Sequence, residues 1–150
     1  MLENLLTLSQ SLNSFDTYAE VSNIVDENGQ ILVKLQKSQL AKGVDNTGLQ
    51  RKDSYRPLTV FIKKQFGKGL GAVVDRVTFF MTGELYSSLF YSRRKEKYSI
   101  RSNEETYTKM LERVGEDKFG LSPESRTDFA KGVLLPDFGK VFERKTGLKI

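Results

Sequence analysis

The chain has 150 residues, which is the size of one typical domain and enough to bury a hydrophobic core. Lys and Arg number 24 against 19 Asp and Glu, so the net charge of +5 allows an anionic partner without requiring one. Cysteine and histidine are both absent, which excludes disulfides, Cys- or His-based zinc sites and Ser–His triads. Because neither a basic leader nor an apolar run of about 20 residues occurs, the sequence predicts a soluble protein made inside the cell, without a membrane partner.

Two helices are expected at the start of the chain. The stretch from Met1 to Asn13 places its leucines on nearly one stripe. This helix either packs on the protein's own core or docks against a neighbouring subunit. A second helix is expected from Asp16, a good N-cap residue, to about Asp26, and Asn28-Gly29 then predicts a turn with positive φ.

A third helix is expected from Gln30 to Lys42. Its apolar residues are Ile31, Leu32, Leu35 and Leu40, and Gly43 fits the position that follows a helix C-cap. A strand that begins at Ile31 is the alternative, because the first half of this segment is β-branched.

The polar stretch from Val44 to Arg56 predicts a surface loop. Its residues Asp45 to Gly48 begin like a calcium-binding loop. However, Gln50 and Arg56 stand where an EF-hand needs a glycine and a bidentate glutamate, so we reject a calcium site.

Pro57 is expected to begin a helix that ends at Gly67. The residues expected to face inward are Leu58, Phe61, Ile62 and Gln65, with Lys63 and Lys64 outward. The glycine-rich stretch from Gly67 to Gly71 predicts a mobile basic loop. It is not a nucleotide-binding P-loop, because Gly69 follows Lys68 where a serine or threonine is required.

The stretch from Val77 to Ser102 contains a strand-like run, a helix start and a basic hairpin. Val73 to Met81 is β-branched and aromatic and predicts a strand. Thr82 is expected to cap a short helix that continues through Leu89. Phe90 to Arg93 and Lys97 to Ser102 predict the two strands of a hairpin. Its turn is expected at Arg94-Lys95-Glu96, with Tyr98 and Ile100 facing inward.

The last third of the chain is expected to be helical. Ser102 to Glu105 resembles a capping box that opens a helix ending at Gly115. The inward residues of this helix are expected to be Tyr107, Met110, Leu111 and Val114. Phe119-Gly120-Leu121 is expected to pack back beneath it.

Ser122-Pro123-Glu124 combines a cap residue, a first-turn proline and an acid, and therefore predicts another helix. Phe129 and Val133 are expected to face inward there. Leu134-Leu135-Pro136 is expected to interrupt this helix. A last helix from Pro136 carries Phe138, Val141 and Phe142, and Lys145 to Ile150 is expected to be a loose basic tail.

Positive charge is concentrated between Arg51 and Arg101, a stretch that contains 12 basic and four acidic residues. Basic residues interleaved with Tyr and Phe are typical of nucleic-acid binding, although an acidic protein partner or a solvated surface explains them as well. The candidate partner- or DNA-facing surface consists of Lys63, Lys64, Lys68, Arg93, Arg94, Lys95 and Lys97. No catalytic or metal-binding constellation accompanies it, so we predict neither an enzyme nor a cofactor.

The order of several short motifs resembles the head–tail joining and tail-completion proteins of tailed bacteriophages. The motif Thr82-Gly83-x-Leu85 with Ser88 precedes a charged hairpin, and a Leu-Pro helix follows at Leu134-Leu135-Pro136. Together the likeness covers roughly residues 39–142, and it marks Thr82, Gly83, Leu85 and Ser88 as the motif that organises the fold. The resemblance implies a non-enzymatic part of the phage neck that works as several copies in a ring between portal and tail.

We therefore expect one α+β domain over residues 1–150. It is expected to comprise an N-terminal helical segment (1–43) and a connector-like core (44–150), in which C-terminal helices pack on a small antiparallel sheet with a hairpin. The expected function is that of a virion structural protein of the neck or tail, made in the host cytoplasm. Its expected partners are further copies and portal, neck and tail proteins, with non-specific contact to packaged DNA. The alternative is a basic nucleic-acid-binding accessory protein.

Overall fold

The computed structural model describes residues 2–52, 54–80, 82–115 and 119–150. The fold is of the predicted α+β class, with N-terminal helices, a two-stranded antiparallel hairpin and C-terminal helices. Contacts group the chain into two compact units. The terminal unit comprises the residues up to Asn28 together with Asp128–Ile150, and the central unit is Gly29–Thr127. The single domain divided after residue 43 stays a prediction, and the contacts place a division after Asn28.

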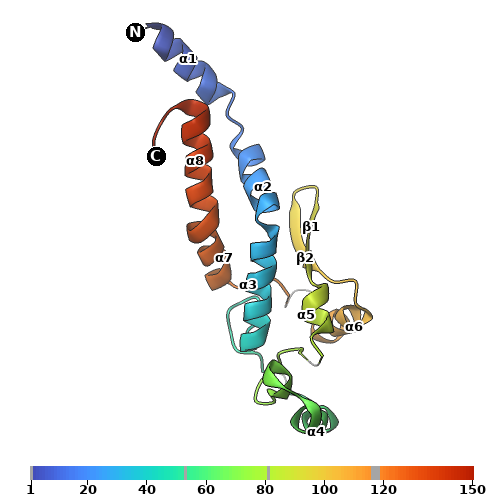
Figure 1. Cartoon of the computed structure of the whole chain (residues 1–150). Helices are drawn as coiled ribbons and strands as arrows, with labels where there is room; N and C mark the ends of the chain where they lie inside the picture. The colour runs from blue at the N-terminus through green and yellow to red at the C-terminus, as the bar shows by residue number, and fades with distance from the viewer. Residues whose placement is uncertain (1, 53, 81, 116–118) are drawn as a thin grey trace. The chain divides into compact units, whose positions relative to one another are not determined.

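The terminal unit is entirely helical in its regular elements. It contains α1 (Leu2–Asn13), α2 (Thr17–Glu27), η3 (Ala130–Leu134) and α8 (Leu135–Thr146), and the end of α7 (Pro123–Phe129) reaches into it. In Figure 1, α8 runs alongside α2. The ring of Phe15, between α1 and α2, meets the rings of Phe138 and Phe142 edge-on at 5.8 and 5.1 Å.

The predicted start of α2 is confirmed. Asp16 has extended backbone angles, and its carboxylate accepts a hydrogen bond from the backbone N–H of Ala19 at 3.0 Å. This bond satisfies one of the N–H groups that a helix start leaves without an intrahelical partner.

The predicted interruption at Leu134-Leu135-Pro136 is wrong. Leu134 and Leu135 both keep right-handed helical angles, at φ −62°, ψ −51° and φ −65°, ψ −45°. A proline inside a helix lacks an N–H donor and crowds the carbonyl four residues earlier. That carbonyl belongs to Gly132, which lies in the wider π-helical turn η3, and the chain remains helical there.

The predicted loose tail from Lys145 is also wrong for its first residues. Helix α8 continues to Thr146, and Gly147 then ends it in the left-handed conformation at φ 75°. The Lys145 ammonium forms an ion pair with Glu20 of α2, and the Thr146 hydroxyl accepts a hydrogen bond from Leu148 N at 3.2 Å.

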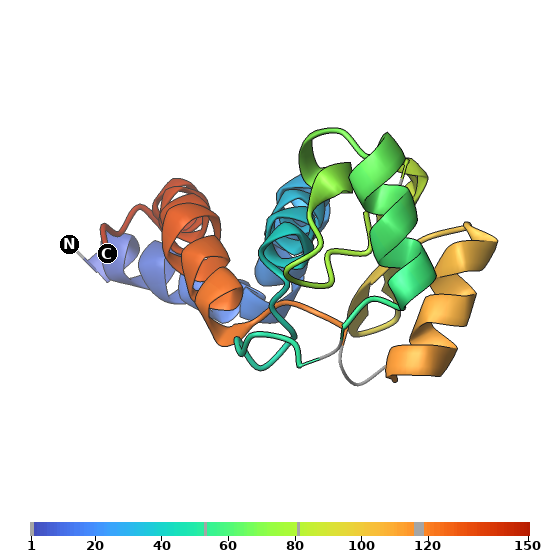
Figure 2. The same cartoon turned by 90° about the horizontal axis from the view of Figure 1, so that it is seen from below.

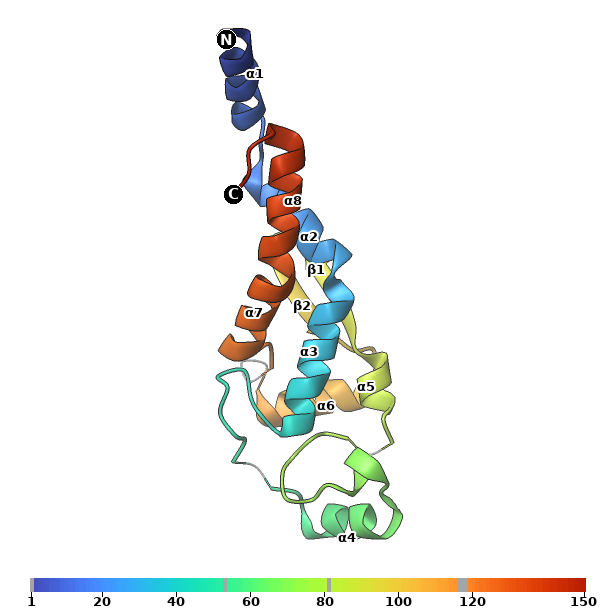
Figure 3. The same cartoon turned by 60° about the vertical axis from the view of Figure 1, so that its left-hand side comes forward.

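The central unit combines helices with the hairpin. Its regular elements are α3 (Gly29–Lys42), α4 (Pro57–Phe66), η1 (Gly69–Ala72), α5 (Glu84–Ser88), β1 (Phe90–Arg94), β2 (Lys97–Arg101) and α6 (Glu105–Val114). Residues of α3, the α5 region and α6 form the core: Val33, Leu40, Leu85, Tyr86, Leu89 and Tyr107. Figure 3 shows the hairpin beside α3. The helical interpretation of residues 30–42 is confirmed, and the strand alternative is wrong.

The turn predicted at Asn28-Gly29 does not form. Asn28 has φ −105°, and Gly29 is the first residue of α3 without a positive φ. A Cβ atom on Gly29 would lie 2.5 Å from Cδ1 of Tyr91 in β1. The glycine is therefore explained by the close approach of the hairpin to α3, not by turn geometry.

The strand predicted from Val73 to Met81 is absent over the described residues 73–80, and Met81 lies outside them. Phe79 even has a left-handed backbone at φ 55°. Side chains take the place of a neighbouring strand. Tyr55 Oη accepts from Thr78 N at 3.0 Å, Tyr86 Oη donates to Thr78 O at 2.7 Å, and Lys63 Nζ donates to Phe80 O. We call Val77–Phe80 the buried segment, since Thr78 is fully buried within it.

The segment after α6 is joined to α3 by Gln39. Its amide nitrogen donates to Asp45 O and Gly120 O at 3.0 and 2.9 Å, and its oxygen accepts from Ser122 N at 2.7 Å. The predicted packing of Phe119 is confirmed, because its ring lies 5.8 Å from that of Tyr107. The predicted helix start at Ser122 is confirmed as well, since its hydroxyl accepts from Ser125 N.

Of the two predicted ends of α6, the start differs from the prediction and the end does not. The N-cap of α6 is Glu104, and Ser102 Oγ accepts from Glu104 N at 3.0 Å, so the predicted capping box does not form. The predicted end at Gly115 is confirmed, with φ 92°. Tyr107 is buried and Leu111 half-buried as predicted, whereas the side chains of Met110 and Val114 lie outside the described set.

Two loops also have local order of their own. The predicted loop from Val44 to Arg56 has no helix or strand among its described residues. Val44 and Gln50 form an isolated antiparallel bridge, within which the carboxylate of Asp45 accepts from Thr47 N and Leu49 N. The loop predicted at Gly67–Gly71 instead contains η1, and Figure 2 shows it joined to α4 by a short connection. A Cβ atom on Gly67 would lie 2.5 Å from Gly71 O, so this connection needs the glycine.

Candidate interaction surfaces

The β1–β2 hairpin is the element that the sequence predicted most closely. Its strands pair antiparallel in the register Phe90↔Arg101, Tyr91↔Ile100, Ser92↔Ser99, Arg93↔Tyr98 and Arg94↔Lys97. Directly opposite residues share a face, and successive residues alternate between the two faces. The register therefore divides the hairpin into an inner and an outer face.

The inner face contains Tyr91, Ile100, Arg93 and Tyr98. Tyr91 and Ile100 pack against the core, so the predicted inward position of Ile100 is confirmed. Tyr98 stacks on Tyr91 at 6.3 Å but is 38% exposed, so its predicted inward placement is only partly met. The Arg93 guanidinium lies 5.7 Å from the Tyr98 ring and donates to Lys95 O in the turn.

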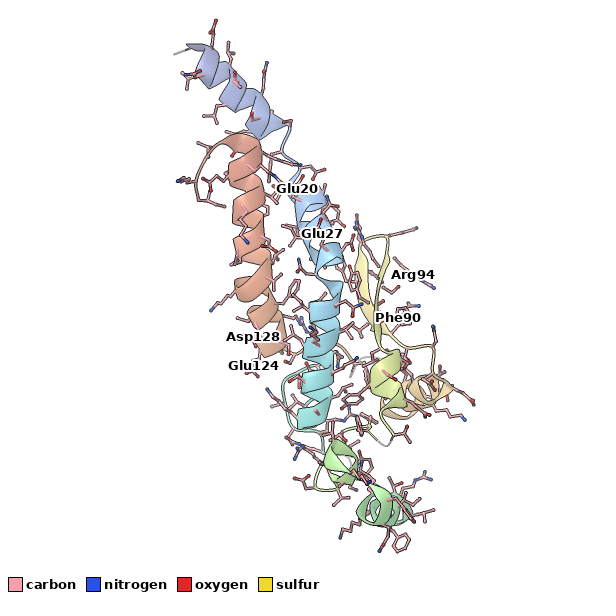
Figure 4. All side chains as sticks on the ribbon, in the orientation of Figure 1. Glu20, Glu27, Phe90, Arg94, Glu124 and Asp128 are labelled. Carbon is pink, nitrogen blue, oxygen red and sulfur yellow. The ribbon has the colours of Figure 1, made fainter. Side chains whose placement is uncertain are left out.

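The outer face contains the three opposite pairs Phe90/Arg101, Ser92/Ser99 and Arg94/Lys97. Figure 4 labels Phe90 and Arg94 at the two ends of β1. Arg94, Lys97 and Arg101 are exposed, and Arg101 Nε donates to Ser99 Oγ at 3.2 Å. This register adds Arg101 to the predicted basic residues. Once the strand pairing is known, the period-two alternation of the sequence places Arg101 on the same face as Arg94 and Lys97.

The predicted orientation of α4 is wrong. Leu58 and Phe61, expected inside, are 69% and 58% exposed, whereas Lys63, expected on the partner-facing surface, is 1% exposed. Gln65 is exposed too, and Ile62 is half-buried. Lys63 must therefore be removed from the candidate surface, while the exposed Lys64 and Lys68 remain on it.

The position of Lys63 has a physical explanation. Its ammonium donates to Phe80 O and lies 4.8 Å from the centre of the Tyr55 ring. A carbonyl oxygen and an aromatic face both stabilise a cation, and the aliphatic stem of lysine packs like an apolar side chain. Lys63 thus holds the backbone of the buried segment from the α4 side.

The predicted basic surface is not one continuous patch. Helix α4 packs mainly against η1, whereas the hairpin packs mainly against α3. Figures 1 and 3 show α4 and the hairpin toward opposite ends of the central unit. Lys64 and Lys68 therefore belong to one surface. The others lie on the hairpin, where Arg93 is on the inner face, Lys95 is in the turn, and Arg94 and Lys97 are on the outer face.

Large apolar side chains are exposed on two separate helices. The apolar face of α4 consists of Leu58, Phe61 and Phe66, which are 69%, 58% and 77% exposed. Helix α1 exposes Leu5, Leu6 and Leu12 at 58%, 63% and 42%. Exposed apolar clusters of this kind mark interaction sites, whereas isolated exposed leucines do not.

The motif that the resemblance marked has defined structural positions. Gly83 is the N-cap of α5 with φ 94°, and Thr82 Oγ1 accepts from Glu84 N at the long distance of 3.5 Å, so the glycine replaces Thr82 as the cap residue. Leu85 lies in the core. Ser88 Oγ donates to Leu85 O and lies 2.5 Å from Ser102 Oγ, which links α5 to the segment after the hairpin.

Beside Lys63 and Gln39, Arg51 and Tyr86 are buried polar side chains that the sequence did not indicate. Arg51 is 9% exposed, and its guanidinium lies 4.6 Å from the centre of the Phe79 ring. Burial, together with the neighbouring Tyr55, raises the pKa of Tyr86 well above its ordinary value. Both residues contact the buried segment, Arg51 through the Phe79 ring and Tyr86 through Thr78 O.

Within the described ranges, no group of three or more acidic residues is arranged to hold a metal ion. No helix among the described residues has both the length and the apolar character needed to cross a membrane. A shallow surface depression is lined by Lys42, Gln50, Asp75 and Arg76. Arg76 pairs there with Asp75 at 3.0 Å and donates to Ala41 O near the end of α3, a structural role.

Comparison with known proteins finds no matching family model, no matching curated protein and no matching solved structure.

Proposed function

We propose that the protein is a non-enzymatic structural component of a tailed-phage neck or tail, a head–tail connector or tail-completion protein that acts as several copies in a ring. The sequence support is the motif order over roughly residues 39–142. The structural observation that carries the proposal is the pair of exposed apolar surfaces on α1 and α4.

Two different apolar surfaces on one chain favour a heterologous contact, in which one surface of a copy meets the other surface of the next. Such contacts close into rings when the rotation between copies allows it. The surfaces also differ in charge. Glu3 is the one charged residue of α1, whereas α4 carries the exposed Lys64 and is flanked by Arg56 and Lys68, with no acidic residue from 54 to 74. Opposite charges at the rim of such a contact favour a defined pairing.

In this proposal the partners are further copies of the chain and the portal, neck and tail proteins. The protein needs no cofactor for this role. Assembly takes place in the host cytoplasm, and the finished location is the virion neck or tail.

Native mass spectrometry of the purified protein, alone and with portal and tail-tube rings, tests the proposal. We expect a discrete oligomer or incorporation into those rings. Replacing Leu58 and Phe61 by serine should abolish it, because the apolar contact is lost. The matched control is Leu49→Ser, which removes an equally exposed apolar residue (68%) from a loop outside α4. A wild-type chain that stays monomeric and joins no ring contradicts the proposal.

A further inference from the structure

The outer face of the hairpin carries positive charge at both of its ends. Arg94 and Lys97 lie opposite each other beside the turn, and Arg101 lies at the far end of β2. At about 3.4 Å per residue, these two ends are about 14 Å apart. Duplex DNA rises about 3.4 Å per base pair, so the face extends over about four base pairs.

These charges are available to a ligand. Among the described residues, no acidic side chain forms an ion pair with Arg94, Lys97 or Arg101. Glu96 lies in the turn, outside both strands. Between Arg101 and the pair Arg94/Lys97, Ser92 lies on the same face, opposite Ser99, whose hydroxyl donates to Ser92 O and accepts from Arg101 Nε.

We propose that this outer face binds the phosphate backbone of double-stranded DNA. Arg94, Lys97 and Arg101 contact phosphates, and Ser92 donates a hydrogen bond between them. A two-stranded ribbon is also narrow enough to follow the groove of a duplex. The contacts reach backbone rather than bases, so the binding is independent of DNA sequence.

The face fits a duplex better than other polyanions. Single strands are held by bases stacked on exposed aromatic rings. Phe90 is half-buried, and the exposed ring of Tyr98 lies on the inner face beneath Arg93. A protein partner is usually anchored by large apolar side chains, and the outer face exposes none of them.

The test is fluorescence anisotropy of a labelled mixed-sequence duplex titrated with the full chain between 50 and 200 mM salt. Three phosphate contacts predict a slope of log K against log salt of about −2.7, or about a 40-fold loss of affinity over that range. The variant Arg94→Gln/Lys97→Gln/Arg101→Gln should lose at least about tenfold in affinity at 50 mM salt, and its slope should flatten. The matched control Lys34→Gln/Lys131→Gln/Arg144→Gln removes the same charge from exposed positions elsewhere and should change affinity by less than about threefold.

Three results would overturn the proposal. The first is an equal loss of affinity in the control variant, since net charge would then explain binding. The second is tighter binding to a single strand than to the duplex. The third is competition by poly-glutamate as effective as that by duplex, which would assign the face to an acidic protein. Light scattering on the same samples reports the oligomeric state separately, so failure here and failure of the ring proposal are distinguishable.

Discussion

The hairpin and the buried segment lie close together in the sequence, but the hydrogen-bonding groups of their backbones have different kinds of partner. In the hairpin, β1 and β2 hydrogen-bond to each other, so the side chains of Arg94 and Lys97 are not needed as partners of the backbone. In the buried segment, the side chains of Tyr55, Tyr86 and Lys63 bind the backbone of Val77–Phe80. Because every buried N–H and C=O needs a partner, these side chains cannot be exchanged without cost to the fold. We therefore expect the side chains around the buried segment to contribute to stability and those of the outer face to contribute to binding.

The largest expected loss of stability comes from replacing Gln39. Like the side chains around the buried segment, its side chain hydrogen-bonds backbone groups of other parts of the chain. The change Gln39→Leu should lower the free energy of unfolding by at least about 3 kcal/mol, because it leaves buried partners of Gln39 at Asp45, Gly120 and Ser122 without a hydrogen bond. Urea unfolding followed by circular dichroism measures it. The matched change Gln30→Leu on the exposed side of α3 should cost less than about 0.5 kcal/mol. Equal effects of the two changes would show that Gln39 has no such role.

Contact between the hairpin and α3 is tested by Gly29→Ala. The new Cβ would lie 2.5 Å from Tyr91 Cδ1, so we expect a loss of about 1–3 kcal/mol and a displaced hairpin. Gly132→Ala is the control, since a Cβ there meets no atom within 4 Å and should be neutral or slightly stabilising. Thermal unfolding measures the change in stability of each variant, and heteronuclear NMR of the hairpin amides detects displacement of the hairpin. A stabilising Gly29→Ala change would mean that the hairpin does not pack on α3 as described.

The change Tyr86→Phe removes the hydroxyl that donates to Thr78 O and should cost about 1–2 kcal/mol at neutral pH. The same change should also alter how the free energy of unfolding depends on pH in the alkaline range. The folded-state pKa of Tyr86 is raised above its unfolded value of 10.0, so its contribution is complete below pH 10 and declines as pH rises further.

Unfolding curves from pH 8 to pH 11 for wild type and Tyr86→Phe isolate this contribution, since all other titrating groups are shared. We expect the wild type to lose more stability above pH 10 than the variant. The control Tyr18→Phe changes a tyrosine that is 52% exposed and should leave the stability at neutral pH unchanged. Parallel alkaline slopes for wild type and Tyr86→Phe would contradict the buried position of the hydroxyl.

The elements that the sequence predicted well depend on local chemistry. Asp16 caps α2, Pro57 begins α4, and Gly115 ends α6, because each residue type fits its position through its own backbone or cap geometry. The hairpin was predictable for the same reason, since its alternation and its turn lie within twelve residues.

The errors arise where distant side chains decide the structure. The run Val73–Met81 has the composition of a strand, but Tyr55, which binds Thr78, lies 23 residues away. In α4 the apolar periodicity grouped Leu58 and Phe61 on one side of the helix, but the predicted inward direction of that side is wrong. The periodicity did not show whether Leu58 and Phe61 turn toward the chain's own core or toward a partner, and Lys63 is buried instead. Arg94, Lys97 and Arg101 could be assigned to the same face only from the strand register, which cannot be read from composition.

The most direct test of the separation between binding and stability is the unfolding free energy of Arg94→Gln/Lys97→Gln/Arg101→Gln. If the outer face of the hairpin serves recognition alone, denaturant unfolding of this variant will give a value within about 0.5 kcal/mol of wild type. A loss of more than about 2 kcal/mol would show that these side chains hold the fold together, and would contradict the assignment of this face to a partner.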